Sequence, residues 1–329
     1  MKKNEKLSKS INTLFDKNHV AYVMIAPFIL AFLVFGLYPI LNTLWLAFTN
    51  TTLMNMNGKF IGFANFQLIF QDEIFWDSTV TTWVIWLLNF LPQLGFAMLL
   101  SVWLTSSRLR IKAVGFWRAV FYLPNLLMPA TVAVLYFNIF SFYGPANQIL
   151  VQGGFLEEAF EFFRSEGFTR GLVAFIQWWM WFGNTIVILV AGMTSISNSL
   201  YESAMMDGAS GLKMFTKITL PCLKPVLIYN LVTSLVGGMQ MFDIPYMLTD
   251  GIGSPNRSIM TVTMYLYRKF KSSKGHIGQA AAVGFYILVI TIICTLIIFY
   301  VLGDKDERAE RKFEKQVRKQ KKLLAKKGA

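Results

Sequence analysis

Long segments without a single charged residue constrain this chain more than any other feature of its sequence. One runs from Ala21 to Phe48 and another from Ser78 to Ser107. Each is longer than the roughly 20 apolar residues that an α-helix needs to cross a bilayer. Hydrophobic residues make up 55% of the 329 residues and aromatic residues 16%, which is typical of a membrane protein. Because backbone groups in lipid must bond within their own segment, we expect an all-α fold.

Further apolar segments complete the expected set of spans. They cover residues 119–144, 171–193, 221–248 and 277–302, so the sequence predicts six transmembrane helices. The first is too long for a signal peptide and has no small-residue cleavage site, so we expect it to be retained, with a bend near Pro27 or Pro39. We divide the chain into a basic N-terminus (1–20), a transmembrane domain (21–302) containing a polar loop (199–221), and a basic tail (303–329).

The distribution of charge predicts how the spans are oriented. The net charge is +13, and the basic residues gather at the two termini and in short loops, which favours anionic membrane lipid over nucleic acid as a partner. By the positive-inside rule, both termini and residues 105–117 and 194–220 lie in the cytoplasm, while 49–77 and 146–170 lie outside. The loop from Asp250 to Gly275 opposes this rule, since it carries five basic residues on the expected outer side.

Residues 146–170 combine acidic side chains with closely spaced phenylalanines. Glu157, Glu158 and Glu161 alternate there with Phe155 and with three further phenylalanines at 160, 162 and 163. This pattern is typical of an amphipathic helix lying in the membrane interface. We therefore expect such a helix on the outer face.

Motifs that carry catalytic chemistry are missing from the sequence. No G-x-x-x-x-G-K-[ST] stretch is present, so the chain is not expected to hydrolyse ATP itself. His19 and His276 lie at opposite ends, and Cys222 and Cys294 have no second cysteine nearby, so neither a metal site nor a disulfide framework is indicated. We expect no catalytic residue, no metal and no cofactor in this chain.

A polar island from Tyr201 to Pro221 separates the fourth and fifth spans. Ser199 and Glu202 have the spacing of a capping box, which predicts a short helix from about Leu200 towards Asp207. Gly208 permits the left-handed turn that would end this helix, and Ser210 can cap a second helix through Phe215. From the residues alone, the island is a cytoplasmic helix-turn-helix.

The order Glu202, Ala204, Gly208, Ile218, Leu220, Pro221 resembles the conserved cytoplasmic loop of bacterial ABC-importer permeases of the binding-protein-dependent type. One position departs, because Ser203 stands where that loop usually has alanine. In the family this loop is the coupling helix, which sits in a cleft of the ATP-hydrolysing subunit, and the architecture is that of a type I importer. The resemblance implies that coupling residues are Glu202, Ala204, Asp207, Gly208, Ala209, Leu220 and Pro221.

Polar groups inside the spans indicate where a substrate could pass. Trp181 and Asn184 share one face of the fourth span, and we expect Gln240, Asp243 and Tyr246 to share a face of the fifth. Polar groups are costly in hydrocarbon and usually face a bundle interior or a cavity. Aromatic planes beside amides and a carboxylate suit a sugar. The alternative is that these groups only bond neighbouring helices.

A second stretch, from Phe242 to Pro255, is similar to the F-D-x-x-Y-x-L-T-x-G-G-P motif of the carbohydrate subgroup of these permeases. Ile252 and Ser254 interrupt its glycine-glycine-proline part. Substrate contacts of the related maltose-type permease fall on positions that match Trp181, Asn184, Gly238 and Met241. That permease usually has asparagines at the last two positions, so we expect a sugar other than maltose.

These observations predict the permease subunit of an ATP-driven importer of a sugar or oligosaccharide in the bacterial cytoplasmic membrane. The resemblance implies a second permease subunit, two ATPase subunits that bind ATP and Mg²⁺, and an extracellular sugar-binding protein as partners. A secondary transporter or channel is the alternative, although only Asp243 could serve an intramembrane relay. A polytopic membrane enzyme would need clustered acidic, His or Cys residues at one membrane face. The transported sugar is left open.

Overall fold

The computed structural model describes residues 17–106, 109 and 111–303, with side chains from Tyr22 onward. Its secondary structure is helical, apart from an isolated bridge between Thr49 and Phe60 within the described residues, so the predicted all-α fold is confirmed. The chain forms two compact units, Met1–Asp72 with Leu266–Tyr286 and Glu73–Tyr265 with Ile287–Ala329. Most of the basic N-terminus and nearly all of the predicted tail lie outside the described residues.

The first unit contains the first membrane-spanning helix. Helices α2 (Lys17–Phe32) and α3 (Tyr38–Ala47) are joined by a π-helical turn over Leu33–Leu37. Pro39 has no N–H to donate to the carbonyl four residues earlier, so the wider turn lies directly before it. The predicted irregularity near Pro39 is therefore present, whereas Pro27 lies inside α2.

A buried amide fixes the end of this span in the first unit. The Asn65 carboxamide, at the start of α4 (Ala64–Phe70), donates to the carbonyls of Ala47 at 2.8 Å and Thr49 at 2.7 Å. These carbonyls have no partner within the helix, so a side chain satisfies them. The same unit holds a half-buried ion pair between Lys269 and Asp72, 2.9 Å apart.

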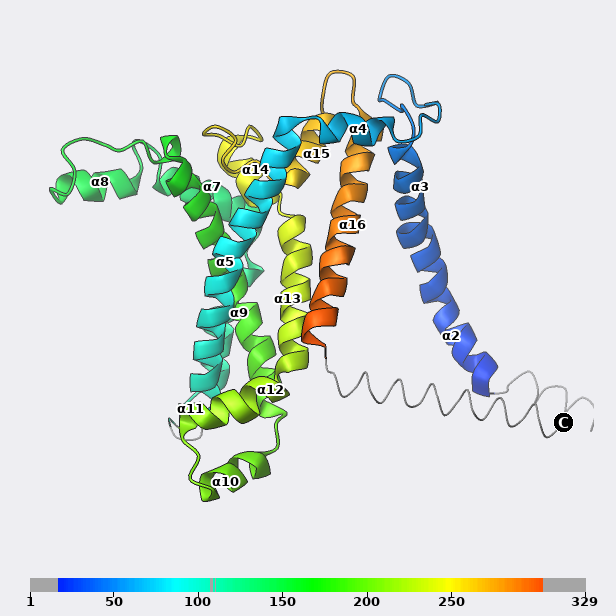
Figure 1. Ribbon diagram of the computed structural model, residues 1–329. Coiled ribbons are helices and arrows are strands. Elements are labelled where there is room, and N and C mark those ends of the chain that lie inside the picture. The colour runs from blue at the N-terminus through cyan, green and yellow to red at the C-terminus, as the bar shows by residue number, and fades with distance from the viewer. Residues whose placement is uncertain (1–16, 107–108, 110, 304–329) are drawn as a thin grey trace, which may run out of the picture. The chain divides into compact units, whose positions relative to one another are not determined.

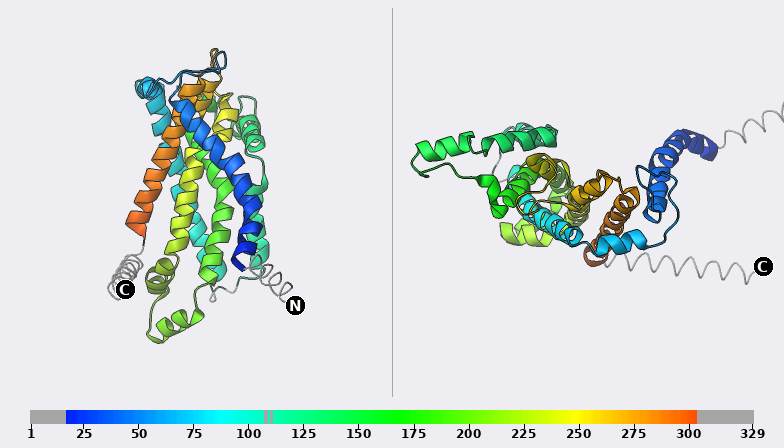
Figure 2. Two further views of the ribbon diagram at one scale, coloured as in Figure 1. Left: turned by 90° about the vertical axis from the view of Figure 1, so that its right-hand side faces the viewer. Right: turned by 90° about the horizontal axis from the view of Figure 1, so that it is seen from above.

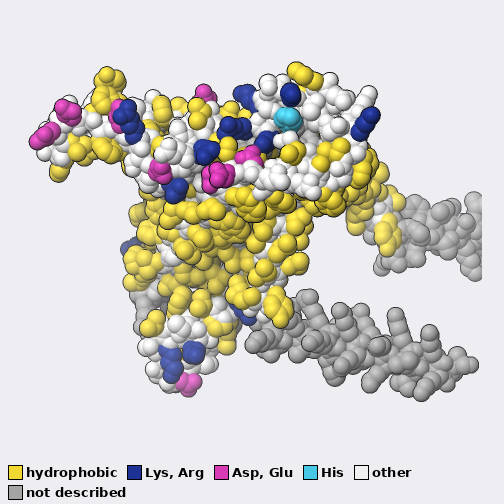
Figure 3. Space-filling view, turned by 45° about the horizontal axis from the view of Figure 1, so that its top comes forward, with side chains coloured by type: hydrophobic (Ala, Val, Ile, Leu, Met, Phe, Trp, Pro, Cys, Tyr) yellow, Lys and Arg dark blue, Asp and Glu magenta, His cyan; other side chains and the backbone are white. Residues whose placement is uncertain are grey.

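The second unit is built on three long helices. Helices α5 (Glu73–Thr105) and α9 (Glu166–Thr194) pack along their length, and α13 (Lys224–Met239) packs on α5 (Figures 1 and 2). A buried hydrogen bond from Gln93 Nε2 to Thr185 Oγ1, 2.8 Å long, joins α5 to α9. Figure 3 shows hydrophobic side chains over the long helices and charged side chains gathered towards their ends.

The third predicted span is broken. Helix α6 (Val114–Tyr122) leads through a 3-10 turn (Leu123–Leu126) to α7 (Pro129–Ile139), and the two parts are bent by 85°. The break follows from proline chemistry, because Pro129 begins a new helix and pushes the residue before it out of the helical conformation. Counting this pair as one, six helical segments of the described chain are long and apolar enough to cross a membrane, in agreement with the predicted number.

The predicted interfacial helix across the phenylalanine-rich segment is wrong. The helix there is α8 (Pro145–Gln152), which ends before the first of those phenylalanines. From Gly153 to Ser165, where α9 follows, the backbone is irregular except for a 3-10 turn at Phe162–Arg164. Phe162 and Phe163 instead pack on rings of α9 and α7, as in the contact of Phe163 with Phe137, whose centroids lie 5.1 Å apart, whereas Phe155 is exposed. Tertiary ring contacts replace the helical face that the spacing suggested.

The remaining helices connect and extend these spans. They are α10 (Asn198–Met206), α11 (Gly211–Met214), α12 (Leu220–Cys222), α14 (Asp243–Thr249), α15 (Val262–Phe270) and α16 (Ile277–Leu302). A π-helical turn over Phe215–Thr219 joins α11 to α12. The predicted second helix of the polar loop thus runs beyond Phe215 to Cys222.

Candidate substrate cavity and coupling loop

The polar loop begins with a helix that is capped differently from the prediction. Helix α10 starts at Asn198, so Ser199 lies inside its first turn and cannot act as the cap of a capping box. Its hydroxyl instead bonds with that of Ser197 at 2.8 Å. The predicted capping box is wrong, although the short helix that it announced is present two residues earlier.

The turn that follows is as predicted. Gly208 has φ of +72°, the left-handed conformation that favours glycine. Ala209 N–H then donates to the Ala204 carbonyl at 2.9 Å, which closes the turn. Ser210 caps α11 by accepting from the N–H of Lys213 at 3.3 Å, as its position suggested.

The loop presents a mixed polar and apolar surface. Glu202, Asp207 and Gly208 are exposed, as are Leu220 and Pro221, whereas Ala204 and Ala209 are half-buried. Among its apolar side chains, Met206 is 89% exposed and Leu212 74% exposed. The hydroxyl groups of Tyr201 and Thr219 bond at 2.9 Å and hold the two arms of the loop together. Whether this surface contacts a partner stays a prediction.

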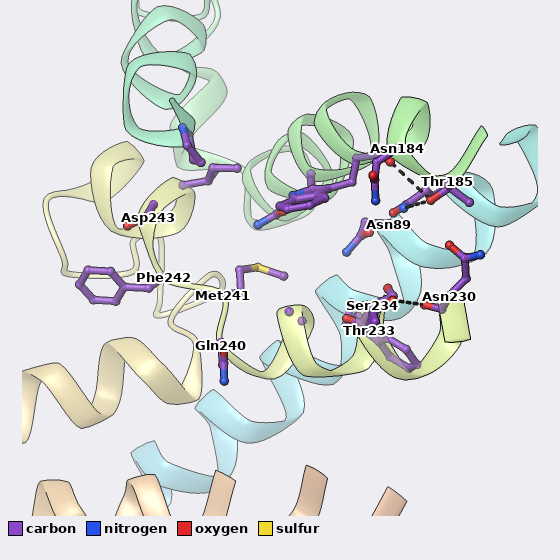
Figure 4. Close-up of a pocket in the computed structure, with 18 residues that line it drawn as sticks. Asn89, Asn184, Thr185, Asn230, Thr233, Ser234, Gln240, Met241, Phe242 and Asp243 are labelled. Carbon is purple, nitrogen blue, oxygen red and sulfur yellow. Dashed lines mark hydrogen bonds between the residues drawn. The ribbon is translucent and has the colours of Figure 1, made fainter. Parts of the chain in front are cut away.

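A cavity of about 230 Å³ lies among α5, α9 and α13 (Figure 4). It is lined by two tryptophans, Trp86 and Trp181, and by a set of six side-chain amides: Asn89, Gln93, Gln177, Asn184, Asn230 and Gln240. Hydroxyl groups come from Thr185, Thr233 and Ser234. The lining therefore offers many neutral donors and acceptors beside aromatic planes.

Six of the seven residues predicted for the substrate pathway border this cavity. They are Trp181, Asn184, Gly238, Gln240, Met241 and Asp243. Tyr246 is not among the lining residues: its ring stacks on Phe242 with centroids 4.8 Å apart. The structure brings the six together, and their role in transport stays a prediction.

The fifth span is not continuous past the cavity, so the predicted shared helix face of Gln240 and Asp243 is wrong. Helix α13 ends at Met239, and α14 starts afresh at Asp243. Broken backbone inside a membrane must find other partners. Thr263 Oγ1 donates to the Met239 carbonyl at 3.1 Å, and Thr261 Oγ1 donates to the Met241 carbonyl at 2.7 Å. The break could not be predicted from the sequence around Gln240, because the threonines that stabilise it lie about twenty residues further along the chain.

The amides of the cavity differ in how far they are satisfied within the chain. Gln93 bonds α9 through Thr185, and the Asn230 amide donates to the carbonyl of Val226 in its own helix at 3.0 Å. These two serve the packing of helices. The Asn184 carboxamide, by contrast, has no side-chain hydrogen bond to any residue of the described chain and faces the cavity (Figure 4). Gln177 and Gln240 likewise have no side-chain hydrogen bond within the described chain, so these three amides are available to bond a passing molecule.

Sequence reasoning missed the part of the lining that α5 supplies. Asn89 and Gln93 lie on the same face, four residues apart, within a charge-free span. The signal that could have found them is the one used for Asn184, a carboxamide inside an otherwise apolar helix.

Comparison with known proteins agrees with this arrangement. The model of the family described as binding-protein-dependent transport system inner membrane component matches residues 75–305. The chain belongs to this family. The resemblance seen in the loop from Tyr201 to Pro221 is thereby confirmed, and the chain is a transport permease rather than an enzyme.

Individual relatives match the permease over most of its length. It is 31% identical to the probable ABC transporter permease protein YesP of Bacillus subtilis, over 91% of this chain and 93% of that protein. The lactose transport system permease protein LacF of Rhizobium radiobacter is 28% identical over 90% of this chain and 97% of that protein. A solved bacterial alginate ABC transporter, in complex with a pentasaccharide-bound periplasmic protein, is similar with a TM-score of 0.72 and 25% identity, over 91% of this chain and 97% of that one.

Proposed function

We propose that this permease is the membrane-spanning subunit of an ATP-driven importer that receives a sugar or oligosaccharide from an external binding protein. The proposal depends on the arrangement of two side chains in the cavity. Trp181 and a carboxamide without an internal partner, Asn184, lie one helical turn apart and border the same space. An indole plane stacks on the C–H face of a sugar ring, while carboxamides bond its hydroxyl groups.

Trp181 and Asn184 are connected along the chain to the loop from Tyr201 to Pro221, which supports a role in ATP-driven transport. Trp181 and Asn184 lie on α9, which three residues join to α10, and Gly238 and Gln240 lie at the end of α13, the helix that follows the loop. A movement of the loop is therefore transmitted along both helices that border the cavity. An ATPase bound at Glu202 and Gly208 would use this link.

The proposed partners are a second permease subunit, two ATPase subunits and the binding protein. The ATPase subunits would supply ATP and Mg²⁺ binding, and both chain termini would lie on their side of the membrane. Names of the relatives support a carbohydrate substrate, since several are permeases for lactose, for arabinooligosaccharides and for trehalose or maltose. The exposed apolar and acidic side chains of the loop support an ATPase contact in the cytoplasm.

A reconstituted complex tests the proposal. The permease and its partner permease, with both ATPase subunits, are placed in proteoliposomes, and the external binding protein is added with a panel of neutral oligosaccharides. We expect at least one sugar to raise ATP hydrolysis and to accumulate only when ATP is present. Accumulation driven by an ion gradient without ATP would contradict the proposal and would favour a secondary transporter.

A further inference from the structure

The charge of the cavity narrows the class of sugar that this permease can pass, an inference that rests on the proposed function. Among the described residues that line the cavity, Asp243 is the only one with an ionisable side chain. The other polar groups are carboxamides and hydroxyls. No lysine, arginine or histidine borders the space, so nothing in the described lining can neutralise an anionic ligand.

Two basic residues near the ends of α5 and α9 make contacts away from the cavity. Arg170 is the nearest on α9, seven residues before Gln177, and its Nε donates to the Ser258 carbonyl at 3.0 Å. Arg257 pairs with Asp77 at 3.6 Å. Both belong to the contacts that hold the outer loop on the ends of α5 and α9, and neither borders the cavity.

Asp243 itself lacks a counter-ion. It is exposed at the start of α14, and no basic residue of the described chain forms an ion pair with it. A cleft lined by charge of one sign focuses its field into the low-dielectric space between the walls and repels ligands of the same sign. A carboxylate, sulfonate or phosphate on a sugar would meet this field without a compensating cation.

We propose that the permease selects neutral sugars and that Asp243 excludes their anionic counterparts. Relatives of this permease include transporters of both neutral and anionic substrates. They include permeases for lactose and arabinooligosaccharides but also for sulfoquinovosyl glycerol and sn-glycerol-3-phosphate, and the similar solved structure imports the acidic polysaccharide alginate. From the lining of its cavity, we place this permease among those that transport neutral sugars.

Paired substrates that differ only at C6 test this assignment. Uptake by the complete importer is measured for α-1,4-galactobiose against digalacturonate, for cellobiose against cellobiouronic acid, and for β-1,4-mannobiose against dimannuronate. We expect neutral sugars to be preferred by about tenfold or more, the lower end of electrostatic effects on association. Equal or greater uptake of an acidic sugar overturns the inference while the proposed function stands. If no sugar of either kind enters, the proposed function fails.

Substitution of Asp243 then shows where the selection is made. With the same binding protein present, Asp243→Asn should reduce the preference several-fold. The matched control is Asp250→Asn, which removes an equal charge seven residues away from a residue that does not line the cavity. Asparagine also tolerates the left-handed conformation of that position, where φ is +49°. An equal effect of both substitutions overturns the role assigned to Asp243.

A second measurement avoids the binding protein. Cysteine is placed at Thr233, on the cavity wall, in a Cys222→Ser, Cys294→Ser background, and its reaction rates with trimethylammonioethyl and sulfonatoethyl methanethiosulfonate are compared. We expect the cationic reagent to be favoured, and Asp243→Asn to reduce that ratio several-fold. If Asp243→Asn leaves the ratio of the two reaction rates unchanged, Asp243 does not exclude anions by its charge. This result can be obtained even where uptake by the variant is too low to measure.

Discussion

Gly238 of α13 lies directly against the indole of Trp86 on α5, so the indole packs on the α13 backbone beside the cavity. A Cβ atom added at Gly238 would lie 2.7 Å from Cγ of Trp86. The indole cannot easily withdraw, because its Nε1 donates to the Ser234 carbonyl at 3.0 Å and the ring stacks on Phe90 with centroids 5.4 Å apart. The glycine is thus required by packing.

Replacing this glycine should destabilise the permease. We expect Gly238→Ala to lower stability in detergent by about 1–3 kcal/mol, the usual cost of an overpacked contact. The measurement is the midpoint of thermal unfolding. Gly237→Ala is the matched control, because a Cβ there meets no atom within 4 Å. Equal midpoints for the two variants would show that α13 and α5 are not packed as described.

The break in the fifth span depends on a hydroxyl group from a distant residue. Thr261 Oγ1 donates to the buried Met241 carbonyl and accepts from the N–H of Met264 at 3.2 Å. Thr261→Val keeps the shape but leaves both groups without this partner, so we expect a loss of about 1–3 kcal/mol. Thr291→Val is the control, since that hydroxyl bonds only the carbonyl of Ile287 in its own helix. Similar unfolding midpoints for both would count against this role of Thr261.

The left-handed turn of the loop should be needed for coupling. A β-branched residue is strained at φ of +72°, by about 1–2 kcal/mol or more. We therefore expect Gly208→Val to abolish sugar-stimulated ATP hydrolysis in the reconstituted complex while the permease still reaches the membrane. Gly208→Asn should retain most of the stimulation, because asparagine tolerates this conformation. Full stimulation by Gly208→Val would remove the turn from the coupling mechanism.

Orientation can be tested by labelling from outside the cell. In a background without Cys222 and Cys294, we expect an impermeant thiol reagent to label Glu158→Cys and to leave Ser210→Cys unmodified. Both positions are exposed in the structure, so accessibility of the side chain is not limiting. Labelling of Ser210→Cys alone would reverse the proposed topology.

The sequence predicted the spans well because lipid imposes a simple rule on them. Length and lack of charge are local properties, and helices such as α9 and α16 follow from them directly. The left-handed turn at Gly208 and the helix cap at Ser210 were also predictable, since both residues act on their immediate neighbours. In each case the residue and the group that it acts on are only a few positions apart in the sequence.

Features that depend on distant contacts were not predictable in the same way. The break after Met239 is stabilised by Thr261 and Thr263, which no periodicity connects to it. Two of the phenylalanines that suggested a surface helix, Phe162 and Phe163, are held by rings on α9 and α7. The cavity was found in part. A carboxamide in a span, such as Asn184 or Asn89, is a local signal, whereas tertiary packing decides which helices bring such carboxamides to one space.

The most direct test of the account is uptake by variants of the cavity. Sugar preference is measured for Trp181→Ala, Asn184→Ala and Gln240→Ala over several oligosaccharides, with each rate divided by the amount of permease in the membrane. If these side chains border the route of the sugar, the order of preferred sugars changes while ATP hydrolysis continues. If they serve only to pack the helices, the amount of folded permease falls and the preference of all three variants equals that of the wild type, which would contradict the proposed cavity.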